Sequence, residues 1–179
     1  MKENYPFRFD ETTGTAYAWF IRMEYRGGQV TSDLEPKLTL SEDKYYDVYQ
    51  RMGNDAFADL LRKMRSNIRQ FFPLDEIKKR ETYLWFENDE LVGGISIHHN
   101  EEENCYEIEK VVVALGYQGK GYGKKLLNFA VAKLQQTHRT PIFLTVAACN
   151  EKAVKMYEKF GFVPVSEIMD EWKVEEKIG

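Results

Sequence analysis

Four glycines stand close together near the middle of the chain, in the stretch V111-V-V-A-L-G-Y-Q-G-K-G-Y-G-K-K. They lie between a segment typical of a strand and a segment typical of a helix. A loop of this kind turns successive backbone N–H groups toward a helix N-terminus, where unsatisfied donors and partial positive charge suit a phosphate. Glycine leaves no Cβ atom to hold the phosphate away. These residues therefore indicate binding of a phosphorylated ligand.

Two common phosphate-binding motifs do not fit this loop. A Walker A loop fails because Tyr122 stands where lysine is required. The dinucleotide fingerprint fails because Lys124 stands where glycine is required. A third pattern, Q/R-x-x-G-x-G, is satisfied in full by Gln118, Gly121 and Gly123. Alone, this pattern is also compatible with an ordinary glycine-rich turn between a strand and a helix.

A second motif follows downstream, in L144-T-V-A-A-C-N-E-K-A-V-K-M-Y-E-K-F-G-F162. A strand leads to Asn150, which opens a helix, and Tyr157 lies two turns into that helix before a Gly-Phe exit. Together the two motifs resemble the acetyl-CoA-binding motifs of the GNAT superfamily of N-acetyltransferases. The resemblance covers about residues 82–165, whereas residues 1–80 match only in outline, as a first strand and two helices.

The resemblance implies an α/β (α+β) fold with a mixed, mostly antiparallel sheet flanked by helices. Its central strands, here 107–113 and 142–147, are expected to splay apart and leave a V-shaped cleft. We expect residues 1–179 to form a single GNAT-like domain. The first strand and two acceptor-side helices would occupy about 15–72, and the acetyl-CoA-binding core about 82–165.

The same resemblance implies a set of cofactor contacts. Main-chain groups of Val111 and Val113 would pair with the pantetheine arm, and the pyrophosphate would rest on the amides from Gln118 to Gly123. Asn150 matches an asparagine that usually contacts the cofactor, and asparagine is also among the best helix N-caps. The expected cofactor-binding residues are Val111, Val113, Gln118, Gly119, Lys120, Gly121, Tyr122, Gly123, Lys124 and Asn150.

Three residues are candidates for the chemistry. Tyr157 matches the tyrosine that protonates the leaving thiolate in many members, although a tyrosine on this helix face could also be a core aromatic. Glu107 and Glu109 are candidates for the general base that receives a proton from the amine. Strand alternation places both on the face of Val111 and Val113, and the alternative is that both are solvated carboxylates.

Hydrophobic periodicity predicts the elements that position these residues. The first strand is expected at 15–25, and a helix is expected to begin at 38–43 with Thr39 or Ser41 as its cap. A break at Gly53–Asp55 would separate it from a second helix that Pro73 stops. The later elements are a hairpin (82–87 with 91–98), a strand (107–113), a helix (121–136), a strand (141–147), a helix (150–160) and a strand (162–165).

The composition narrows the class of protein. The net charge of −4 argues against a general nucleic-acid binder. Two cysteines without a CxxC pair indicate reduced thiols, and neither a metal-ligand spacing nor a membrane-spanning run is present. The N-terminus has no apolar core typical of a signal peptide. A cytoplasmic location is the resulting prediction.

We therefore predict an N-acetyltransferase that moves an acetyl group from acetyl-CoA directly to a primary amine of a small molecule or protein. The alternative is a non-catalytic acyl-CoA-binding sensor or regulatory module. Transfer of a longer acyl chain, or transfer to oxygen, would use the same cofactor loop. The expected partners are an amine or peptide acceptor, with no nucleic acid, membrane or metal, and the chain would be a monomer or homodimer.

Overall fold

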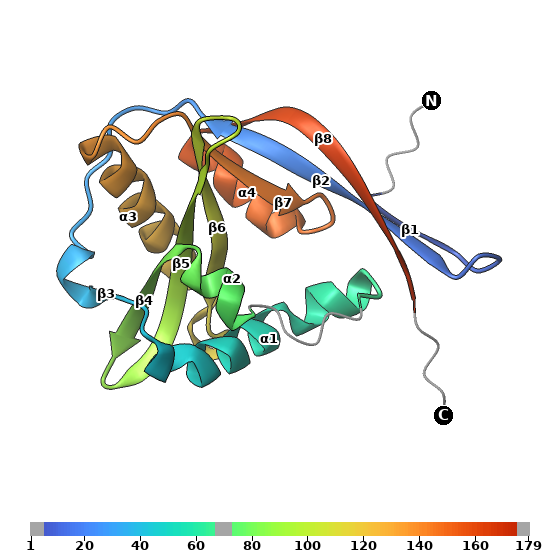
Figure 1. Cartoon of the computed structure of the whole chain (residues 1–179), viewed down its shortest axis with the longest axis horizontal. Helices are drawn as coiled ribbons and strands as arrows, with labels where there is room; N and C mark the ends of the chain where they lie inside the picture. The colour runs from blue at the N-terminus through green and yellow to red at the C-terminus, as the bar shows by residue number, and fades with distance from the viewer. Residues whose placement is uncertain (1–5, 67–72, 175–179) are drawn as a thin grey trace.

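The computed structural model describes residues 6–66 and 73–174, which are built around one open sheet (Figure 1). Within these ranges eight strands join the sheet. The strands are β1 (Phe7–Asp10), β2 (Thr15–Tyr25), β3 (Leu38–Leu40), β4 (Glu81–Glu87), β5 (Glu90–Asn100), β6 (Cys105–Val113), β7 (Ile142–Ala147) and β8 (Phe162–Lys173).

Helices cover both sides of this sheet. The α-helices are α1 (Tyr46–Lys63), α2 (Leu74–Lys78), α3 (Tyr122–Gln136) and α4 (Glu151–Phe160), with 3-10 turns at Glu35–Lys37, Asp43–Tyr45 and Leu115–Tyr117. Two adjacent glycines of β5 identify the two faces. A Cβ atom on Gly93 would meet Leu126 of α3, whereas one on Gly94 would meet Tyr49 of α1. Because adjacent strand residues point to opposite faces, α3 and α1 lie on opposite sides of the sheet.

The main core lies on the α3 side. The face of α3 expected from its periodicity is fully buried and packs against Ile95, Ile108 and Leu144 of the sheet. Burying one leucine side chain stabilises the fold by about 1.5–3 kcal/mol. Helix α4 joins the same core through Tyr157. A smaller cluster around Tyr49 and Leu84 fills the space between α1, α2 and the sheet.

The sheet is mixed and mostly antiparallel, which confirms the expected fold class. The strand order is β1-β2-β7-β6-β5-β4-β3, and β8 pairs with β2. Among the described strands, β6 and β7 form the parallel pair, and their pairing is limited to Tyr106–Ile108 with Ile142–Leu144. Beyond that point β6 continues to Val113 and β7 to Ala147 without pairing with each other. This is the expected splay of the central strands.

Strand β2 occupies an unexpected position for an N-terminal segment. Its residues Phe20–Glu24 pair with β7, and β8 pairs along it from Thr15 to Tyr25. The N-terminal part of the chain is thus inserted between two strands that are separated from it by more than a hundred residues. In Figure 1, β2 and β8 run side by side as a long twisted ribbon.

Most of the expected elements are confirmed, and the first helical region contains the errors. Leu38–Leu40 is a strand paired with β4, so neither Thr39 nor Ser41 caps a helix. Helix α1 begins at Tyr46 and runs without a break through Gly53–Asp55, where Gly53 is buried in the structure. Tertiary packing of this face compensates for the low helix propensity of glycine.

The predicted stop at Pro73 is also wrong. Helix α1 already ends at Lys63, and Pro73 instead precedes the short helix α2, whose first residue is Leu74. Proline is well tolerated at a helix start because its missing N–H is not needed there. The last residues expected in the second helix, 67–72, lie outside the described residues. Neither strand β1 nor helix α2 was predicted from the sequence.

Candidate active site

The splayed strands open onto the glycine loop. After β6, the chain makes a short 3-10 turn at Leu115–Tyr117 and then enters α3 through Gly121. Gly119 and Gly121 have φ values of +75° and +87°, in the left-handed region that favours glycine. The backbone therefore turns sharply between the end of the strand and the helix, as the sequence pattern requires.

The amides of this loop have free hydrogen-bonding capacity. The first α3 amide with a backbone acceptor is that of Lys125, which donates to the Gly121 carbonyl at 3.2 Å. Within residues 6–66 and 73–174, the six preceding amides, those of residues 119–124, have no acceptor. The first amides of an α-helix have no intrahelical acceptor, and here the amides of the preceding loop extend that run, so the loop and the helix N-terminus together could hold an anion.

Open space lies in front of the same loop. A Cβ atom built on Gly119 or Gly121 would meet nothing within 4 Å. The need for glycine therefore comes from the backbone conformation, and the loop leaves room for a ligand. Gly123 is different, because its Cβ would lie 3.5 Å from the Met156 sulfur atom, where α3 approaches α4.

The loop side chains divide between structural and open positions. Tyr122 points into the β4–β5 hairpin, donates to Glu87 at 3.0 Å and packs on Trp85. Gln118 donates through Nε2 to the Val113 carbonyl at 3.0 Å, and Lys120 donates to the Gly116 carbonyl at 3.1 Å. The side chain of Tyr122 therefore points away from the open space in front of the loop, and only its backbone lies next to that space. Lys124 is exposed.

Helix α4 carries the two downstream candidates. Asn150 is its N-cap, and the side-chain oxygen accepts from the Ala153 amide at 3.4 Å, which confirms the expected capping role. Two turns later Tyr157 is 9% exposed and packs against Phe162. Burial raises the pKa of Tyr157 to about 12, so its hydroxyl stays protonated at neutral pH. No described residue hydrogen-bonds to that hydroxyl, which is therefore available as a proton donor.

A β-bulge in β6 overturns the expected shared face of the glutamates and valines. The register with β5 shifts between the Ser96–Glu109 pair and the Gly94–Val112 pair, and Lys110 has a φ of +54°. One extra residue at this point reverses the alternation. Val111 and Val113 consequently pack on the α3 side, whereas Glu107 and Glu109 lie on the α1 side. The two groups therefore lie on opposite faces of β6.

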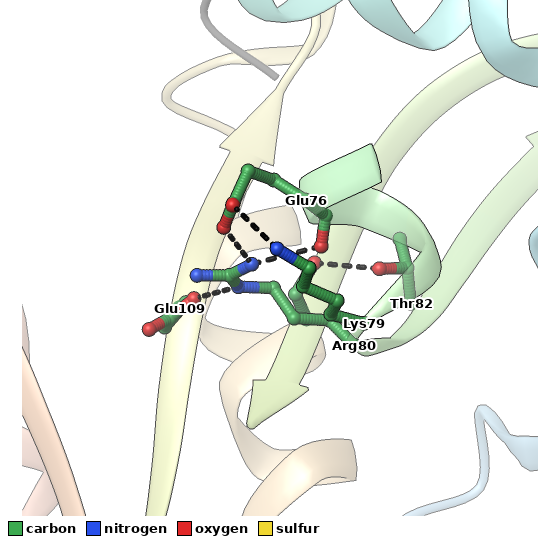
Figure 2. A network of polar contacts seen from close by, with 6 residues as sticks. Glu76, Lys79, Arg80, Thr82 and Glu109 are labelled. Atoms are coloured by element: carbon green, nitrogen blue, oxygen red, sulfur yellow. Dashed lines mark hydrogen bonds and ion pairs between the residues drawn. The ribbon is translucent and has the colours of Figure 1, made fainter. Parts of the chain in front are cut away.

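Glu109 is held by an arginine that the sequence reasoning missed. Arg80, immediately before β4, donates through Nε to Glu109 and through Nη1 to Glu76 at 2.7 Å, as Figure 2 shows. The side chain of Glu109 is 24% exposed. Lys110 lies beside the same group, and burial lowers its pKa. A basic residue immediately before a predicted strand was the available signal, but it is too common to identify a site.

Glu107 has a second arginine partner from the inserted strand. Arg22 of β2 lies 3.2 Å from Glu107 through Nη1 and also pairs with Glu103 in the β5–β6 turn. Asn100 donates to Glu107 at the longer distance of 3.4 Å. The sequence could not connect Arg22 with Glu107, because the contact depends on β2 lying next to β7.

A cavity of about 400 Å³ lies beside Arg80, between α2 and the β3–β4 edge. Its wall combines acidic, basic, hydroxyl and apolar side chains. The acidic and basic members are already paired in part, with Lys78 lying 2.9 Å from Asp43. This cavity is on the side of the sheet that carries Glu107 and Glu109, which makes it a candidate for part of the acceptor site. It is lined by Leu40, Ser41, Glu42, Asp43, Tyr46, Leu74, Ile77, Lys78, Lys79, Arg80, Glu81 and Thr82.

Two further side chains near the candidate site are part of the packed interior. Cys149 is buried, burial raises the pKa of its thiol, and its carbonyl accepts from Lys63 at 3.2 Å. Tyr49 of α1 is fully buried and belongs to the core. Among the described residues no group of three or more His, Cys, Asp or Glu side chains could hold a metal ion. None of the described helices is long and apolar enough to cross a membrane.

Comparison with protein families gives one match over most of the chain. Residues 44–162 match the acetyltransferase (GNAT) family. This range contains the glycine loop, both candidate glutamates, Asn150 and Tyr157. It leaves out β1, β2, β3 and almost all of β8.

Two curated relatives match smaller parts. An N-acetylaspartate synthetase of Xenopus tropicalis is 32% identical over 108 residues, which cover 57% of this chain and 37% of the relative. A mycothiol acetyltransferase of Corynebacterium efficiens is 37% identical over 86 residues, covering 46% of this chain and 28% of the relative. The chain therefore spans only about a third of the length of these relatives.

Solved structures share the fold at low sequence identity. A GNAT-family protein of Novosphingobium aromaticivorans has a TM-score of 0.68 at 15% identity and covers 92% of this chain and 65% of its own. A Bacillus subtilis acetyltransferase in complex with CoA has a TM-score of 0.56 at 20% identity, covering 73% of this chain and 78% of its own. At these identities the similarity concerns the fold.

Proposed function

The chain belongs to the acetyltransferase (GNAT) family, and we propose that it transfers an acetyl group from acetyl-CoA directly to the nitrogen of a primary amine. The observation that carries this proposal is the run of unpaired amides at residues 119–124, beside a gap between two splayed strands. Family membership supports acetyl-CoA as the donor, and one structural relative was solved with CoA.

The loop residues supply the binding of the donor. The amides of residues 119–124 would hold the pyrophosphate, with Gly119 and Gly121 giving the backbone its shape and Lys124 adding positive charge. Main-chain groups of Val111 and Val113 would pair with the pantetheine arm along the open edge of β6. Acetyl-CoA supplies a thioester whose carbonyl carbon is open to attack by an amine. The Val113 carbonyl would first have to give up or share its bond with Gln118.

The catalytic groups would act from the two sides of the gap. The acceptor nitrogen attacks the thioester carbon, a C–N bond forms and the C–S bond breaks. Tyr157 donates its proton to the leaving sulfur, and its protonated state at neutral pH suits that role. Glu107, or Glu109 as the close second, would receive a proton from the amine, directly or through water. Since both glutamates lie on the α1 side, we propose that the acceptor enters from that side.

One observation favours a different function. Both candidate bases are already ion-paired, Glu107 with Arg22 and Glu109 with Arg80. Each arginine occupies carboxylate oxygens that would otherwise be free to receive a proton from the amine. A non-catalytic acyl-CoA-binding sensor would keep the same loop without needing a base, so it remains the second candidate.

The proposal is tested first by binding and then by turnover. A calorimetric titration with acetyl-CoA, CoA and NAD should give heat for the two CoA species and none for NAD. Thiol release should then be followed with a panel of amines that includes amino acids, polyamines and a peptide N-terminus. Binding without thiol release from any amine would favour the sensor, and lack of binding by acetyl-CoA would overturn both functions.

A further inference from the structure

The glycine loop contacts the neighbouring β4–β5 hairpin at both of its ends. Tyr117, at the start of the loop, donates through its hydroxyl to Glu90 at 3.0 Å. Tyr122, at the end of the loop, donates through its hydroxyl to Glu87, also at 3.0 Å. The two tyrosine rings lie edge to face, with their centroids 5.4 Å apart. One hairpin therefore holds the backbone on either side of the two left-handed glycines.

The two glutamates form an unfavourable pair for the hairpin itself. Glu87 and Glu90 lie directly opposite one another and flank the two-residue turn Asn88–Asp89, whose φ values of +49° and +64° fit a tight hairpin. Like charges at directly opposed strand positions destabilise a sheet. Within residues 6–66 and 73–174, neither carboxylate has a basic side chain within 4.0 Å. The pair thus weakens the hairpin but provides the glycine loop with two hydrogen-bond acceptors.

Each of the two contacts joins a neutral hydroxyl to a charged carboxylate. Hydrogen bonds of this kind are stronger than those between neutral groups, and they raise the pKa of both tyrosines above the ordinary value. Tyr122 is restrained further by Trp85, because the centroids of the two rings are 4.7 Å apart. The amide of Tyr122 is itself one of the six without an acceptor. Its position therefore depends directly on the contact with Glu87.

The loop needs such restraints because glycine loses more conformational freedom on ordering than any other residue. Donors that are already aligned bind an anion more tightly, since no ordering cost is added on binding. Resting on the proposed use of acetyl-CoA, we propose that Glu87 and Glu90 are positioning residues for donor binding. Through Tyr122 and Tyr117 they hold the loop amides in place for the pyrophosphate, although their own charge repels an anion.

The charge and the acceptor oxygens of the glutamates have opposite effects on donor binding, so substitutions can separate them. The double variant Glu87→Leu with Glu90→Leu removes both, and its Kd for acetyl-CoA in the calorimeter should rise about tenfold. The double variant Glu87→Gln with Glu90→Gln keeps an acceptor oxygen without the charge, so its affinity should equal or exceed that of the wild type. Glu102→Leu is the matched control, because Glu102 is exposed at the other end of β6, and its Kd should not change.

A second measurement, made without ligand, distinguishes positioning from general stability. NMR order parameters of the Gly119 and Gly121 amides should be about 0.85 in the wild type and the glutamine variant, and below about 0.6 in the leucine variant. The leucine variant loses an unfavourable charge pair, so it should keep a cooperative thermal transition. Adding Tyr117→Phe and Tyr122→Phe to it should weaken binding by less than about twofold more, because each glutamate acts through its tyrosine.

The possible results separate this inference from the proposed function. Unchanged or tighter binding of acetyl-CoA by the leucine variant would overturn the inference alone, because the carboxylates would then act on the donor only through their charge. An equal loss of affinity in the glutamine and leucine variants would also overturn it, as would equal order parameters in the leucine variant and the wild type. Failure of the wild type to bind acetyl-CoA would overturn the proposed function and, with it, the role of the glutamates.

Discussion

Tyr157 and the two glutamates differ in how well they are prepared for proton transfer. Tyr157 is buried, protonated and without a hydrogen-bond partner among the described residues. Each glutamate, by contrast, is bound by an arginine from another element. Tyr157 is thus better prepared to act as the acid than either glutamate is to act as the base, and the two roles can be tested separately.

Changing Tyr157 to phenylalanine should slow turnover without weakening donor binding. General acid catalysis typically contributes about 10²–10⁴-fold, so we expect kcat to fall about 100-fold with the Kd for acetyl-CoA within about twofold. Stopped-flow thiol release and calorimetry measure the two quantities. Tyr17→Phe is the control, since Tyr17 of β2 lies under Arg8 at the β1–β2 edge and contacts none of the candidate site residues. An unchanged kcat in Tyr157→Phe would remove this residue from the mechanism.

The same tyrosine should make stability fall at alkaline pH. Burial raises its pKa to about 12, compared with 10.0 for an ordinary tyrosine. Below pH 10 the Tyr157 hydroxyl is protonated in both the folded and the unfolded protein, so the free energy of unfolding does not change. Between pH 10 and pH 12 the hydroxyl ionises only in the unfolded protein, and the free energy of unfolding decreases. At pH 11 this contribution is about 1.4 kcal/mol. Urea unfolding at pH 9 and pH 11 should show a smaller decrease for Tyr157→Phe than for the wild type, and equal decreases would contradict the assignment.

Of the two glutamates, Glu107 is the better candidate for the base. Its partners lie at 3.2 Å and 3.4 Å, whereas Arg80 holds Glu109 more closely and is itself fixed by Glu76. Glu107→Gln should therefore lower kcat by about 100-fold and Glu109→Gln by less than about tenfold. Both variants should still bind acetyl-CoA in the calorimeter. The reverse order of effects would assign the base to Glu109.

At the scale of elements, the sequence was most informative where local signals and tertiary packing agree. In the strand–loop–helix units around Gly121 and Asn150, the positions of the glycines, the helix cap and the spacing of the apolar residues all indicate the same structure. Leu38–Leu40 was misassigned because three residues next to good helix formers became a strand only through pairing with β4. The bulge at Lys110 had no signal in the sequence, and it changed which face carries Glu107 and Glu109.

The backbone conformation of the glycine loop depends on the left-handed turn at Gly121. Gly121 has a φ of +87°, and placing a Cβ atom on a left-handed residue costs about 1–2 kcal/mol. Gly121→Ala should move the loop amides out of position and weaken acetyl-CoA binding about tenfold. Gly116→Ala is the matched control, because Gly116 has no positive φ and a Cβ there would meet nothing within 4 Å. Equal affinities for the two variants would argue against the amide cradle.

At the scale of the whole molecule, the inserted strand β2 connects the two ends of the described chain. It separates β7 from β8 and supplies Ala16, Ala18 and Met23, none of which is exposed. It also carries Arg22 to Glu107, so one candidate catalytic residue depends on a segment outside the range that matches the family. Sequence comparison alone would therefore place the boundary of the functional unit too late in the chain.

A chain that begins at Ser32, and so lacks β1 and β2, should not fold cooperatively. Without β2 the backbone groups of β7 and β8 lose their partners, and unpaired strand edges are unfavourable and prone to aggregation. Loss of Met23 alone removes about 1.5–3 kcal/mol of burial, against a total stability of about 5–15 kcal/mol for a typical domain. Circular dichroism during heating should therefore show no cooperative transition.

A chain that begins at Thr12 isolates the contribution of β2 from that of β1. Strand β1 pairs only with Thr15–Ala18, so its removal leaves the contacts of β2 with β7 and most of those with β8. This variant should keep a cooperative transition at a lower temperature and should still bind acetyl-CoA. If the chain from Ser32 also unfolds cooperatively and binds acetyl-CoA, the range matched by the family is sufficient to fold, and β2 is an addition to the domain instead of one of its central strands.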